Sequence, residues 1–592
     1  MKKRISFIVF CLLAAAYFQP ITAQETLISN QITYSNETRA SGDIVIEYGA
    51  ELVITGILRV APGNAIIIRP GGKLTVDGGV ITSMGSGQMW KGILVTGNAG
   101  YGSASNRQGV LELKNGAVIE HALNAVRLWD GVSYTTAGGI IHAQNATFRN
   151  NREAVEFLKY RGLFMVGVND IIIEGSYFRQ CTFTINNNNY FSANGVSFSR
   201  HVYLWEIDNI QFKGCTFKNE TTGISSSSSL RGRGIHALDA KFNISAYCTI
   251  PGNYSCIGAV YYPSFNGFYY GIYATSSAGN TSPFSVTQAR FENNYYGIRA
   301  SGIQNAVITH STFIASFTGA VRGIYLTGCT GYKIRENSFT GLNTQAIGSR
   351  TSYGIQVLNS GTATNYISTN VFKYMGYGIY VSGSNGDNNI DGTGLSFDCN
   401  DFIENRYGIY VADNAVIRVK QGGPDAGSNN VFQNNQMDFR ANTQNIILYY
   451  YSPLTNHAPV TYSGNLFLSG NAGRVHCYRS IIVNSNSLAE NEQRNEIITE
   501  SRSQEAETND QNKVSVDVFP NPVQDILQIN LQDIEEADAL VEFFDVTGKR
   551  VYSEKIRDYN NTLQLGHLTA GIYFYRISTP GQIIAQDKIV KN

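Results

Sequence analysis

A repeat of 24–31 residues constrains the fold of this chain more than any other feature. Each unit has an aromatic residue, often Asn-Asn, then Gly-Ile and a short apolar run, most clearly in residues 291–298, 372–379 and 402–409. Repeats of one period stack into a solenoid, because each unit leaves apolar edges that only its neighbour covers. The apolar residue of the Gly-Ile step, with Ala or Val allowed in the step, recurs at Ile93, Val126, Val155, Val196, Ile235, Ile272, Ile298, Ile324, Ile355, Ile379 and Ile409, and Phe439 continues the series.

A second series keeps the same period. Thr-Phe and Asn-x-Phe take one place in successive units, so we expect the Phe rings to stack inside the solenoid. Asparagine in a repeated place can hydrogen-bond along the stack and satisfy buried turn amides. The series comprises Phe148, Phe183, Phe217 and Phe313, then Asn337/Phe339, Asn370/Phe372, Asn400/Phe402, Asn430/Phe432 and Asn465/Phe467.

The short runs within each unit are rich in β-branched and aromatic residues, which favour strands over helices. Gly and Asn between the runs accept the left-handed backbone of tight corners. The sequence therefore predicts an all-β parallel β-helix of roughly 12 or more coils. Residues 24–483 are its predicted extent, with residues 24–42 as a candidate N-terminal cap that covers the first bare edge.

The opening coils also carry a family resemblance. Residues 68–79 (Ile-Arg-Pro-Gly-Gly-Lys-Leu-Thr-Val-Asp-Gly-Gly) and 90–97 (Trp-Lys-Gly-Ile-Leu-Val-Thr-Gly), with the coils that follow, resemble right-handed β-helix proteins of the pectin-lyase-like superfamily. The resemblance covers roughly residues 43–480. It implies a right-handed solenoid, and it leaves the activity open because this fold carries several.

The N-terminus reads as an export signal, residues 1–23, with cleavage expected after Ala23. Lys2, Lys3 and Arg4 precede an apolar run of about 14 residues, shorter than the roughly 20 that span a bilayer. We therefore prefer a signal peptide to a membrane anchor and expect no transmembrane segment in the mature chain. Lys+Arg and Asp+Glu are equal at 45 each, so the balance gives no basic face for nucleic acid.

A polar stretch, residues 484–513, is a predicted linker to a second domain, residues 514–592. About seven short strands there predict a small Ig-like β-sandwich. Its motifs include Pro520-Asn521-Pro522, Gly548 and Gly571. They resemble the type IX secretion C-terminal sorting domain, type A, of Bacteroidetes. The resemblance implies export by the type IX machinery, removal of this domain by a surface sortase, and a cell-surface or extracellular location. The alternative is a binding sandwich that stays on the mature protein.

Sequence signals for catalysis are weak. Glu206 and Asp208 are predicted to share one strand face near Lys213, which would suit acid–base chemistry. A solvated strand face explains the same pattern. No cofactor is predicted; a loose Ca²⁺ site in the loop that holds Asp387 and Asp391 has no other support. Neither a CxxC pair nor a histidine cluster suggests a metal site.

Two further features bear on binding and stability. Tyr261, Tyr262, Tyr269 and Tyr270 are candidate polysaccharide-binding residues, although such rings also fill widened coils. Cys248 and Cys256 are eight residues apart across a turn, and a disulfide is plausible between them in an exported protein. We therefore hypothesise a non-catalytic surface protein that binds glycans or mediates adhesion. The alternative is a secreted polysaccharide lyase or glycoside hydrolase.

Overall fold

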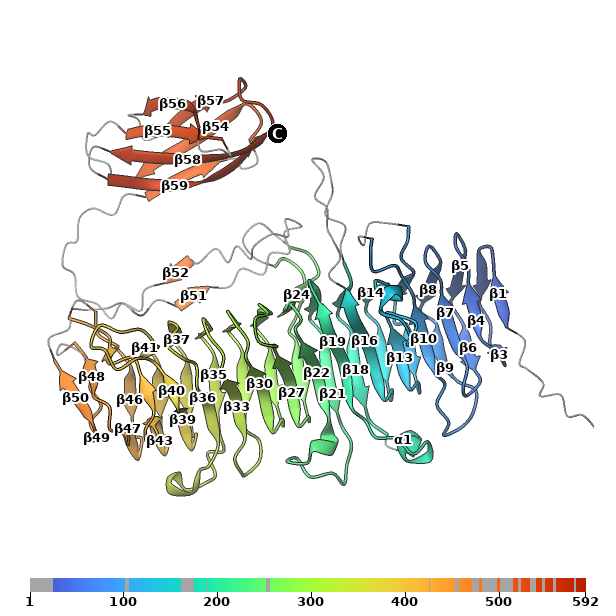
Figure 1. The fold of residues 1–592 in the computed structure, drawn as a ribbon, viewed down its shortest axis with the longest axis horizontal. Coiled ribbons are helices and arrows are strands. Elements are labelled where there is room, and N and C mark those ends of the chain that lie inside the picture. Colours follow the sequence, from blue (N-terminus) through green and yellow to red (C-terminus); the bar gives the residue numbers. More distant parts are fainter. Residues whose placement is uncertain are drawn as a thin grey trace, which may run out of the picture. The chain divides into compact units, whose positions relative to one another are not determined.

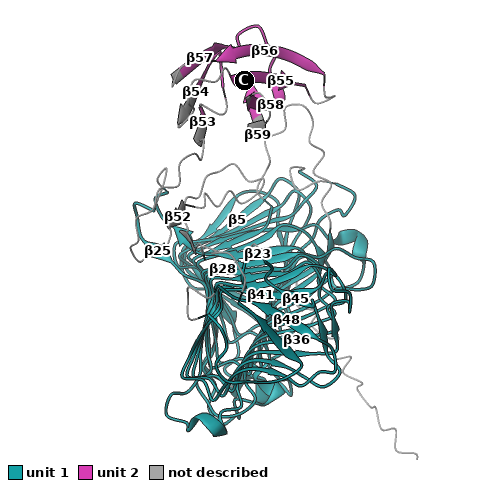
Figure 2. Cartoon of the chain, turned by 90° about the vertical axis from the view of Figure 1, so that its left-hand side faces the viewer, with its two compact units in different colours: residues 1–502 teal, residues 503–592 magenta. Residues whose placement is uncertain are grey.

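The computed structural model describes residues 25–591 except 102–105, 161–174, 188, 252–255, 425, 453–456, 471–476, 478, 482–497, 501–514, 520–522, 533–538, 546–548, 557–559 and 580–581. The chain divides into two compact units, residues 1–502 and 503–592 (Figure 2). The predicted signal peptide with Ala23, and Pro520, Asn521, Pro522 and Gly548, lie outside the described residues. So does the linker, apart from residues 498–500.

Three long sheets, in which every pairing is parallel, build the first unit as a right-handed parallel β-helix (Figure 1). Sheet A has 16 strands in the order β1 (Thr26–Ile28), β4 (Ile44–Ile46), β7 (Ala65–Ile68), β10 (Gly92–Val95), β13 (Asn124–Arg127), β16 (Glu153–Tyr160), β19 (Arg200–Ile207), β22 (Arg233–Leu238), β27 (Tyr270–Thr275), β30 (Tyr296–Ser301), β33 (Arg322–Thr327), β36 (Tyr353–Leu358), β39 (Tyr377–Ser382), β43 (Tyr407–Val411), β47 (Met437–Ala441) and β49 (Tyr462–Gly464).

Sheet B has 13 strands: β2 (Ile32–Tyr34), β5 (Glu51–Ile54), β8 (Lys73–Asp77), β11 (Val110–Lys114), β14 (Ile140–Gln144), β17 (Tyr177–Arg179), β20 (Ile210–Lys213), β23 (Phe242–Ser245), β28 (Phe284–Thr287), β31 (Val307–Thr309), β34 (Lys333–Arg335), β37 (Asn365–Ser368) and β41 (Leu395–Asp398). Sheet C has 14: β3 (Thr38–Ala40), β6 (Ile57–Val60), β9 (Val80–Ser83), β12 (Val118–Glu120), β15 (Thr147–Arg149), β18 (Thr182–Ile185), β21 (Thr216–Asn219), β26 (Ser264–Asn266), β29 (Arg290–Glu292), β32 (Thr312–Ile314), β35 (Ser338–Thr340), β38 (Val371–Lys373), β42 (Asp401–Ile403) and β46 (Val431–Gln433).

Shorter elements decorate the solenoid. Small sheets pair β24 (Tyr247–Cys248) with β25 (Val260–Tyr261), β40 (Ser384–Asn385) with β44 (Val416–Ile417), β45 (Lys420–Gln421) and β48 (Ile447–Tyr450) with β50 (Leu466–Ser469), and β51 (Arg479–Ile481) with β52 (Ile498–Glu500). The described helical turns are η1 (Tyr134–Thr136), α1 (Asn189–Ala193), η2 (Ser229–Arg231) and η3 (Ile347–Ser349). No described helix is long and apolar enough to cross a membrane.

The predicted Phe series forms one column inside the solenoid. The rings stack in register with centroids 4.6–5.2 Å apart, close to the spacing of neighbouring strands. The column also explains the Gly of the Gly-Ile step. A Cβ at Gly297 would lie 2.6 Å from the Gly323 carbonyl oxygen and 2.8 Å from the Phe313 ring. Members of the column are Phe148, Phe183, Phe217, Phe265, Phe291, Phe313, Phe339, Phe372, Phe402 and Phe432.

The predicted asparagine ladder is present at the corner between sheets B and C. The backbone N–H of Asn337 donates to Oδ1 of Asn370, whose own N–H donates to Oδ1 of Asn400, at 3.0 Å each. Nδ2 of Asn370 donates to the Ile334 carbonyl at 2.9 Å, so each amide joins consecutive coils. Asn430 continues the ladder, and all four side chains are buried. The ladder therefore pairs turn groups that would otherwise be buried without partners.

Three details of the predicted register are wrong. Val202, not Val196, pairs with Val155 and Ile235, because the insertion that carries α1 hides the true period. Phe467 pairs with Leu448 in a separate small sheet and is 54% exposed, so it lies outside the Phe column. Residues 26–40 form an ordinary first coil, since β1, β2 and β3 pair in register with β4, β5 and β6, and no separate cap occupies this stretch.

The second unit holds two antiparallel sheets. One contains β53 (Ser515–Phe519), β54 (Ile526–Gln532) and β57 (Asn560–Gln564), and the other β56 (Arg550–Ile556), β55 (Ala539–Phe544), β58 (Gly571–Thr579) and β59 (Gln582–Lys591). Leu527 and Ile529 from the first sheet share one buried core with Val541 and Phe543 from the second. The unit is a β-sandwich, and its Ig-like topology stays a prediction. Gly571 begins β58.

Candidate functional site

Two neighbouring columns of outward side chains on sheet A form the most distinctive surface of the solenoid. They run over nine adjacent strands, β19 to β47, which at the usual strand spacing is about 38 Å. We call these 18 residues the Tyr/Arg strip. The first column is Arg200, Arg233, Tyr270, Tyr296, Arg322, Tyr353, Tyr377, Tyr407 and Met437, and the second is Tyr203, His236, Tyr273, Arg299, Tyr325, Gln356, Tyr380, Tyr410 and Arg440.

The rings of the strip stack on one another. Tyr377 lies between Tyr353 and Tyr407, with ring centroids 4.7 and 5.1 Å away. The guanidinium of Arg322 lies 5.0 Å from the ring centroid of Tyr296 and 5.1 Å from that of Tyr353. Because neighbours occupy the ring faces, the strip offers ring edges, hydroxyls and guanidinium N–H groups to a ligand, in place of open aromatic faces.

The strip has a cationic bias. None of its 18 positions is Asp or Glu, and five are Arg. Among the described residues, Arg200 pairs with Glu153 at 3.2 Å, whereas Arg233, Arg299, Arg322 and Arg440 form no ion pair with a carboxylate. Burial and the neighbouring Arg200 lower the pKa of Arg233. Burial disfavours the charged guanidinium, and repulsion from Arg200 adds to this effect.

The tyrosines of the strip act as neutral hydrogen-bond donors. Burial raises the pKa of Tyr296, Tyr353, Tyr377 and Tyr380 above the ordinary tyrosine value, so these hydroxyls keep their protons at physiological pH. Guanidinium groups are donors without acceptor capacity. The strip is therefore rich in donors and positive charge, which is complementary to a polymer that carries carboxylate or sulfate groups.

Two carboxylates that sequence reasoning missed lie in register with the N-terminal end of the strip. Nδ2 of Asn124 donates to Glu153 at 3.0 Å and to Glu156 at 3.3 Å, and Glu156 also accepts from Arg127 at 2.7 Å. Burial raises the pKa of Glu153, with Glu156 adding to the rise against the effect of Arg200. Regular alternation places positions three apart on opposite faces of a strand, so nothing in the sequence indicated this pair; their common contact with Asn124 is what joins them.

The predicted catalytic residues do not form one constellation. Glu206 pairs with Lys159 at 3.4 Å, whereas Asp208 pairs with Lys241 at 3.1 Å. Glu206 has a φ of 47°, and β19 ends at Ile207, so the alternation that would place both acids on one face is interrupted. Asp208 borders a cavity of about 20 Å³, room for a single water. Lys213 ends β20, the next strand along the chain.

The four predicted binding tyrosines divide between two surfaces. Tyr270 belongs to the strip, and Tyr269 flanks it, stacked on Tyr295 with centroids 5.1 Å apart. Burial and the neighbouring tyrosines raise the pKa of Tyr269 to about 12. Tyr261 and Tyr262 are 44% and 55% exposed and lie on and beside β25, in a hairpin outside sheet A. These four tyrosines are close together in the sequence, but the fold places them on separate surfaces.

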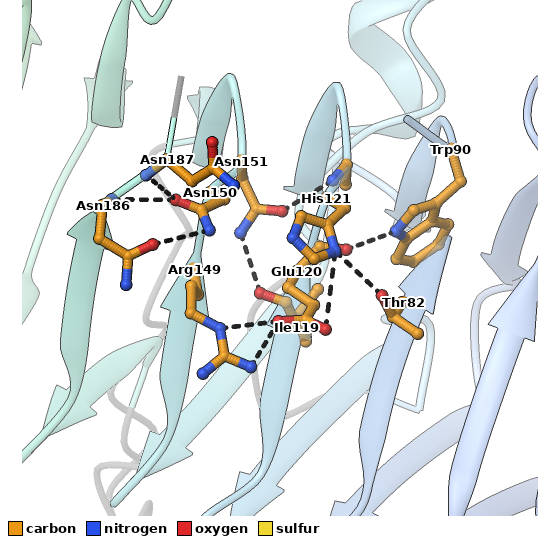
Figure 3. A network of polar contacts seen from close by, with 11 residues as sticks. Thr82, Trp90, Ile119, Glu120, His121, Arg149, Asn150, Asn151, Asn186 and Asn187 are labelled. Atoms are coloured by element: carbon orange, nitrogen blue, oxygen red, sulfur yellow. Dashed lines mark hydrogen bonds and ion pairs between the residues drawn. The ribbon is translucent and has the colours of Figure 1, made fainter. Parts of the chain in front are cut away.

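A polar network at the corner between sheets C and A has catalytic residue types (Figure 3). Nδ1 of His121 lies 3.1 Å from the Thr82 hydroxyl and 3.6 Å from Glu120, which also pairs with Arg149 at 2.6 Å. Thr82 and Glu120 both approach the same ring nitrogen, whereas in a catalytic triad the two partners contact opposite ring nitrogens. Tyr190 of α1 stacks on the His121 ring at 3.8 Å. The network therefore fastens the α1 insertion to the solenoid.

Disulfides fix two peripheral segments. The structure has the Cys248–Cys256 disulfide in the β24–β25 hairpin and a second between Cys399 and Cys477, 78 residues apart. Cys181, Cys215 and Cys329 are buried free thiols. No group of three or more His, Cys, Asp or Glu side chains suited to a metal ion occurs among the described residues.

Comparison with known proteins gives a family match for part of the second unit and several solved structures of similar fold. Residues 517–592 match the family of secretion system C-terminal sorting domains. No curated protein matches the chain. Among solved structures, the tailspike protein of E. coli bacteriophage HK620, in complex with a pentasaccharide, is 11% identical with a TM-score of 0.38, over 91% of this chain and 87% of that one. The family 28 exopolygalacturonase of Yersinia enterocolitica is 10% identical with a TM-score of 0.28, over 72% and 74%.

Similarities this low say nothing about activity, so the fold assignment comes from the sheets described above. The fold and the family match together define an exported parallel β-helix protein with a C-terminal sorting domain. Its sorting domain directs it through type IX secretion to the cell surface or the extracellular space.

Proposed function

We propose that this exported β-helix is a non-catalytic surface protein that binds an extended acidic polysaccharide along the Tyr/Arg strip. Adhesion to polymer-coated surfaces would follow from such binding. The observation that supports the proposal is a run of nine strands whose outward columns carry ten Tyr, five Arg and no acidic residue. We further propose that the type IX machinery recognises residues 514–592 and that a surface sortase removes them. The solenoid is then the part that binds the polymer.

The positive charge of the strip favours an anionic ligand. Tyr hydroxyls and guanidinium groups donate to carboxylate or sulfate oxygens in charge-assisted hydrogen bonds. A neutral polymer would leave the Arg side chains without counter-ions. The regular coil spacing repeats the same donors along about 38 Å, so a long chain gains avidity over a short fragment.

The test compares polygalacturonate with its fully methyl-esterified form, which has the same backbone without the charge. We expect the purified protein to retain only the charged polymer in affinity electrophoresis. Arg299→Gln with Arg322→Gln should weaken retention about tenfold. Arg335→Gln, which removes an outward Arg of sheet B in the same coil as Arg322, is the matched control and should bind normally. Equal retention of both polymers would contradict the proposal.

A second candidate function is hydrolysis or lyase cleavage of the bound polysaccharide. Its support is the Glu153/Glu156 pair, which shares one amide donor and in which Glu153 has a raised pKa, the pattern of a general acid beside a carboxylate. Against it, both side chains are largely buried, at 8% and 11% exposure. New reducing or unsaturated ends that disappear in Glu153→Gln, but persist in Glu206→Ala or Asp208→Ala, would establish an enzyme at this pair. Ends that disappear only in Glu206→Ala or Asp208→Ala would restore the carboxylates predicted from sequence.

A further inference from the structure

A surface groove lies apart from the Tyr/Arg strip, at the corner between sheets B and C. Its volume is about 600 Å³, within the usual size of ligand sites. Its lining includes Lys114, His142, Tyr177, Gln180 and Thr182, which come from three neighbouring coils. None of these residues belongs to the Tyr/Arg strip.

The β24–β25 hairpin borders the groove. Tyr261 of β25 lines it, and the Tyr247 hydroxyl of β24 accepts from Nε2 of Gln144 at 3.5 Å. The hairpin is seated at Gly214, where a Cβ would lie 2.8 Å from the Tyr247 Cβ and 2.9 Å from the Tyr261 Cβ. Equivalent corner positions in earlier coils carry larger residues, Asn145 and Gln180, which also have positive φ. Glycine therefore permits the hairpin to pack against this coil.

The hairpin is held by the Cys248–Cys256 disulfide. Because the bridge closes a short loop, it limits the conformations that the hairpin can adopt. The groove therefore has a fixed border before any ligand arrives, which lowers the entropic cost of binding.

Stacked side chains occupy one side of the groove. The rings of His142 and Tyr177 are parallel within 13°, with centroids 4.7 Å apart, and the Arg179 guanidinium lies 4.1 Å from the Tyr177 centroid. These groups come from β14 and β17, which pair in register. The stack fixes the orientation of Tyr177, whose side chain lines the groove.

The acidic and the basic side chain that line the groove, Glu112 and Lys114, pair with each other. Glu112 accepts an ion pair from Lys73 at 2.7 Å and from Lys114 at 3.3 Å, and Lys114 also lies 3.8 Å from Asp77. The bond from Lys73 lowers the pKa of Glu112, so this carboxylate stays ionised and paired. Beside the His142 imidazole and the Tyr177 ring, the polar lining includes amides and a hydroxyl from Gln144, Gln180 and Thr182. Such groups donate and accept hydrogen bonds equally, which suits an uncharged ligand rich in hydroxyls.

We propose that this groove is a second saccharide site, specific for a short neutral oligosaccharide, separate from the polyanion surface of sheet A. The groove follows the corner over four coils, about 14 Å, from Asn115 to Gly214, where the hairpin stands. It therefore takes a chain end or a side branch, whereas the strip takes the length of a polymer.

The test uses the full chain and four neutral probes: cellotetraose, laminaritetraose, mannotetraose and maltotetraose. We expect at least one to bind in saturation-transfer NMR and titration calorimetry, with an affinity unchanged between about 0.05 and about 0.5 M NaCl. Tyr177→Ala should weaken that binding about tenfold. Gln144→Trp, at an exposed position, should abolish it by filling the groove, and it covers the case in which Tyr177→Ala misfolds.

Tyr380→Ala in the strip is the matched control and should leave tetrasaccharide binding unchanged. Parallel retention of polygalacturonate tests the strip separately, so either site can fail alone. Absence of binding by all four tetrasaccharides would overturn the proposal. So would binding that survives both groove variants or that falls with salt as the strip's binding does.

Discussion

The interior Phe column and the outward Tyr columns of sheet A are built alike and face opposite environments. Phe372 and Phe402 stack at 5.0 Å inside, and Tyr377 and Tyr407 stack at 5.1 Å outside, in the same two coils. Both spacings follow from the distance between parallel strands. Stacking in register is thus a property of the solenoid and is not itself evidence of function. The outward columns differ in carrying hydroxyls and guanidinium groups, which the interior column lacks.

The largest expected effect is on the interior side of this comparison. Phe339→Ala should lower the free energy of unfolding by about 3–5 kcal/mol, because it empties a fully buried place in the column. Tyr380→Ala, outside, should cost about 1 kcal/mol or less. Denaturant unfolding of the two variants measures the contrast, and equal losses would mean that the outward columns are structural too.

Acid should destabilise the protein through histidines on both sides of sheet A. Burial lowers the pKa of interior His201, and burial with Arg233 and Arg200 lowers that of His236 in the strip, each from 6.5 to about 3. The unfolded chain takes up these protons as pH falls through 6.5, whereas the folded chain does not until about 3. Stability is therefore present above 6.5 and is lost between 6.5 and 3.

For His201 alone this loss is about 2 kcal/mol near pH 5. His201→Phe should reduce the slope of unfolding free energy against pH by about one proton, and His236→Phe should do the same. Unfolding midpoints measured at a series of pH values provide the comparison. An unchanged slope in His201→Phe would show that this ring is already protonated in the folded state.

Polar packing inside the solenoid should matter less than the Phe column. Asn370→Ala should cost about 1–3 kcal/mol, since it leaves the Asn337 N–H and the Ile334 carbonyl buried without their partner. Asn389→Ala, at an exposed loop position, is the control and should cost about 0.5 kcal/mol or less. If both variants unfold at the same denaturant concentration, water makes the hydrogen bonds that the Asn370 side chain made, and the ladder does not stabilise the fold.

The smallest change separates hydroxyls from rings on the outside. Tyr377→Phe with Tyr407→Phe keeps the stacked rings, so stability should shift by about 0.5 kcal/mol or less. Retention of polygalacturonate should fall about threefold to tenfold, because two donors are lost. Phe372→Leu, in the interior Phe column, should show the reverse pattern: the free energy of unfolding should fall, and retention of polygalacturonate should stay unchanged. Undiminished retention in the Tyr variant would assign binding to the Arg side chains alone.

Several features were predictable from the sequence because they repeat. Every coil packs against its neighbours in the same way, so the residues that make these contacts recur at one period. This holds for the Phe column from Phe148 to Phe432, for the Asn337–Asn370–Asn400–Asn430 ladder and for the glycine of the Gly-Ile step. The Val196 assignment failed for the converse reason: an insertion breaks the period, and only pairing with Val155 and Ile235 identifies Val202.

The sequence by itself determined the solenoid, its interior columns and the C-terminal sorting domain, because local repeats and short motifs encode them. Only the tertiary structure decided which outward side chains lie together. It placed Tyr270 in the strip and Tyr261 on the groove, joined Glu153 to Glu156, and paired Glu206 and Asp208 with different lysines. The physical reason is that interior positions are constrained by every neighbouring coil, whereas outward neighbours depend on the lengths of the insertions between coils.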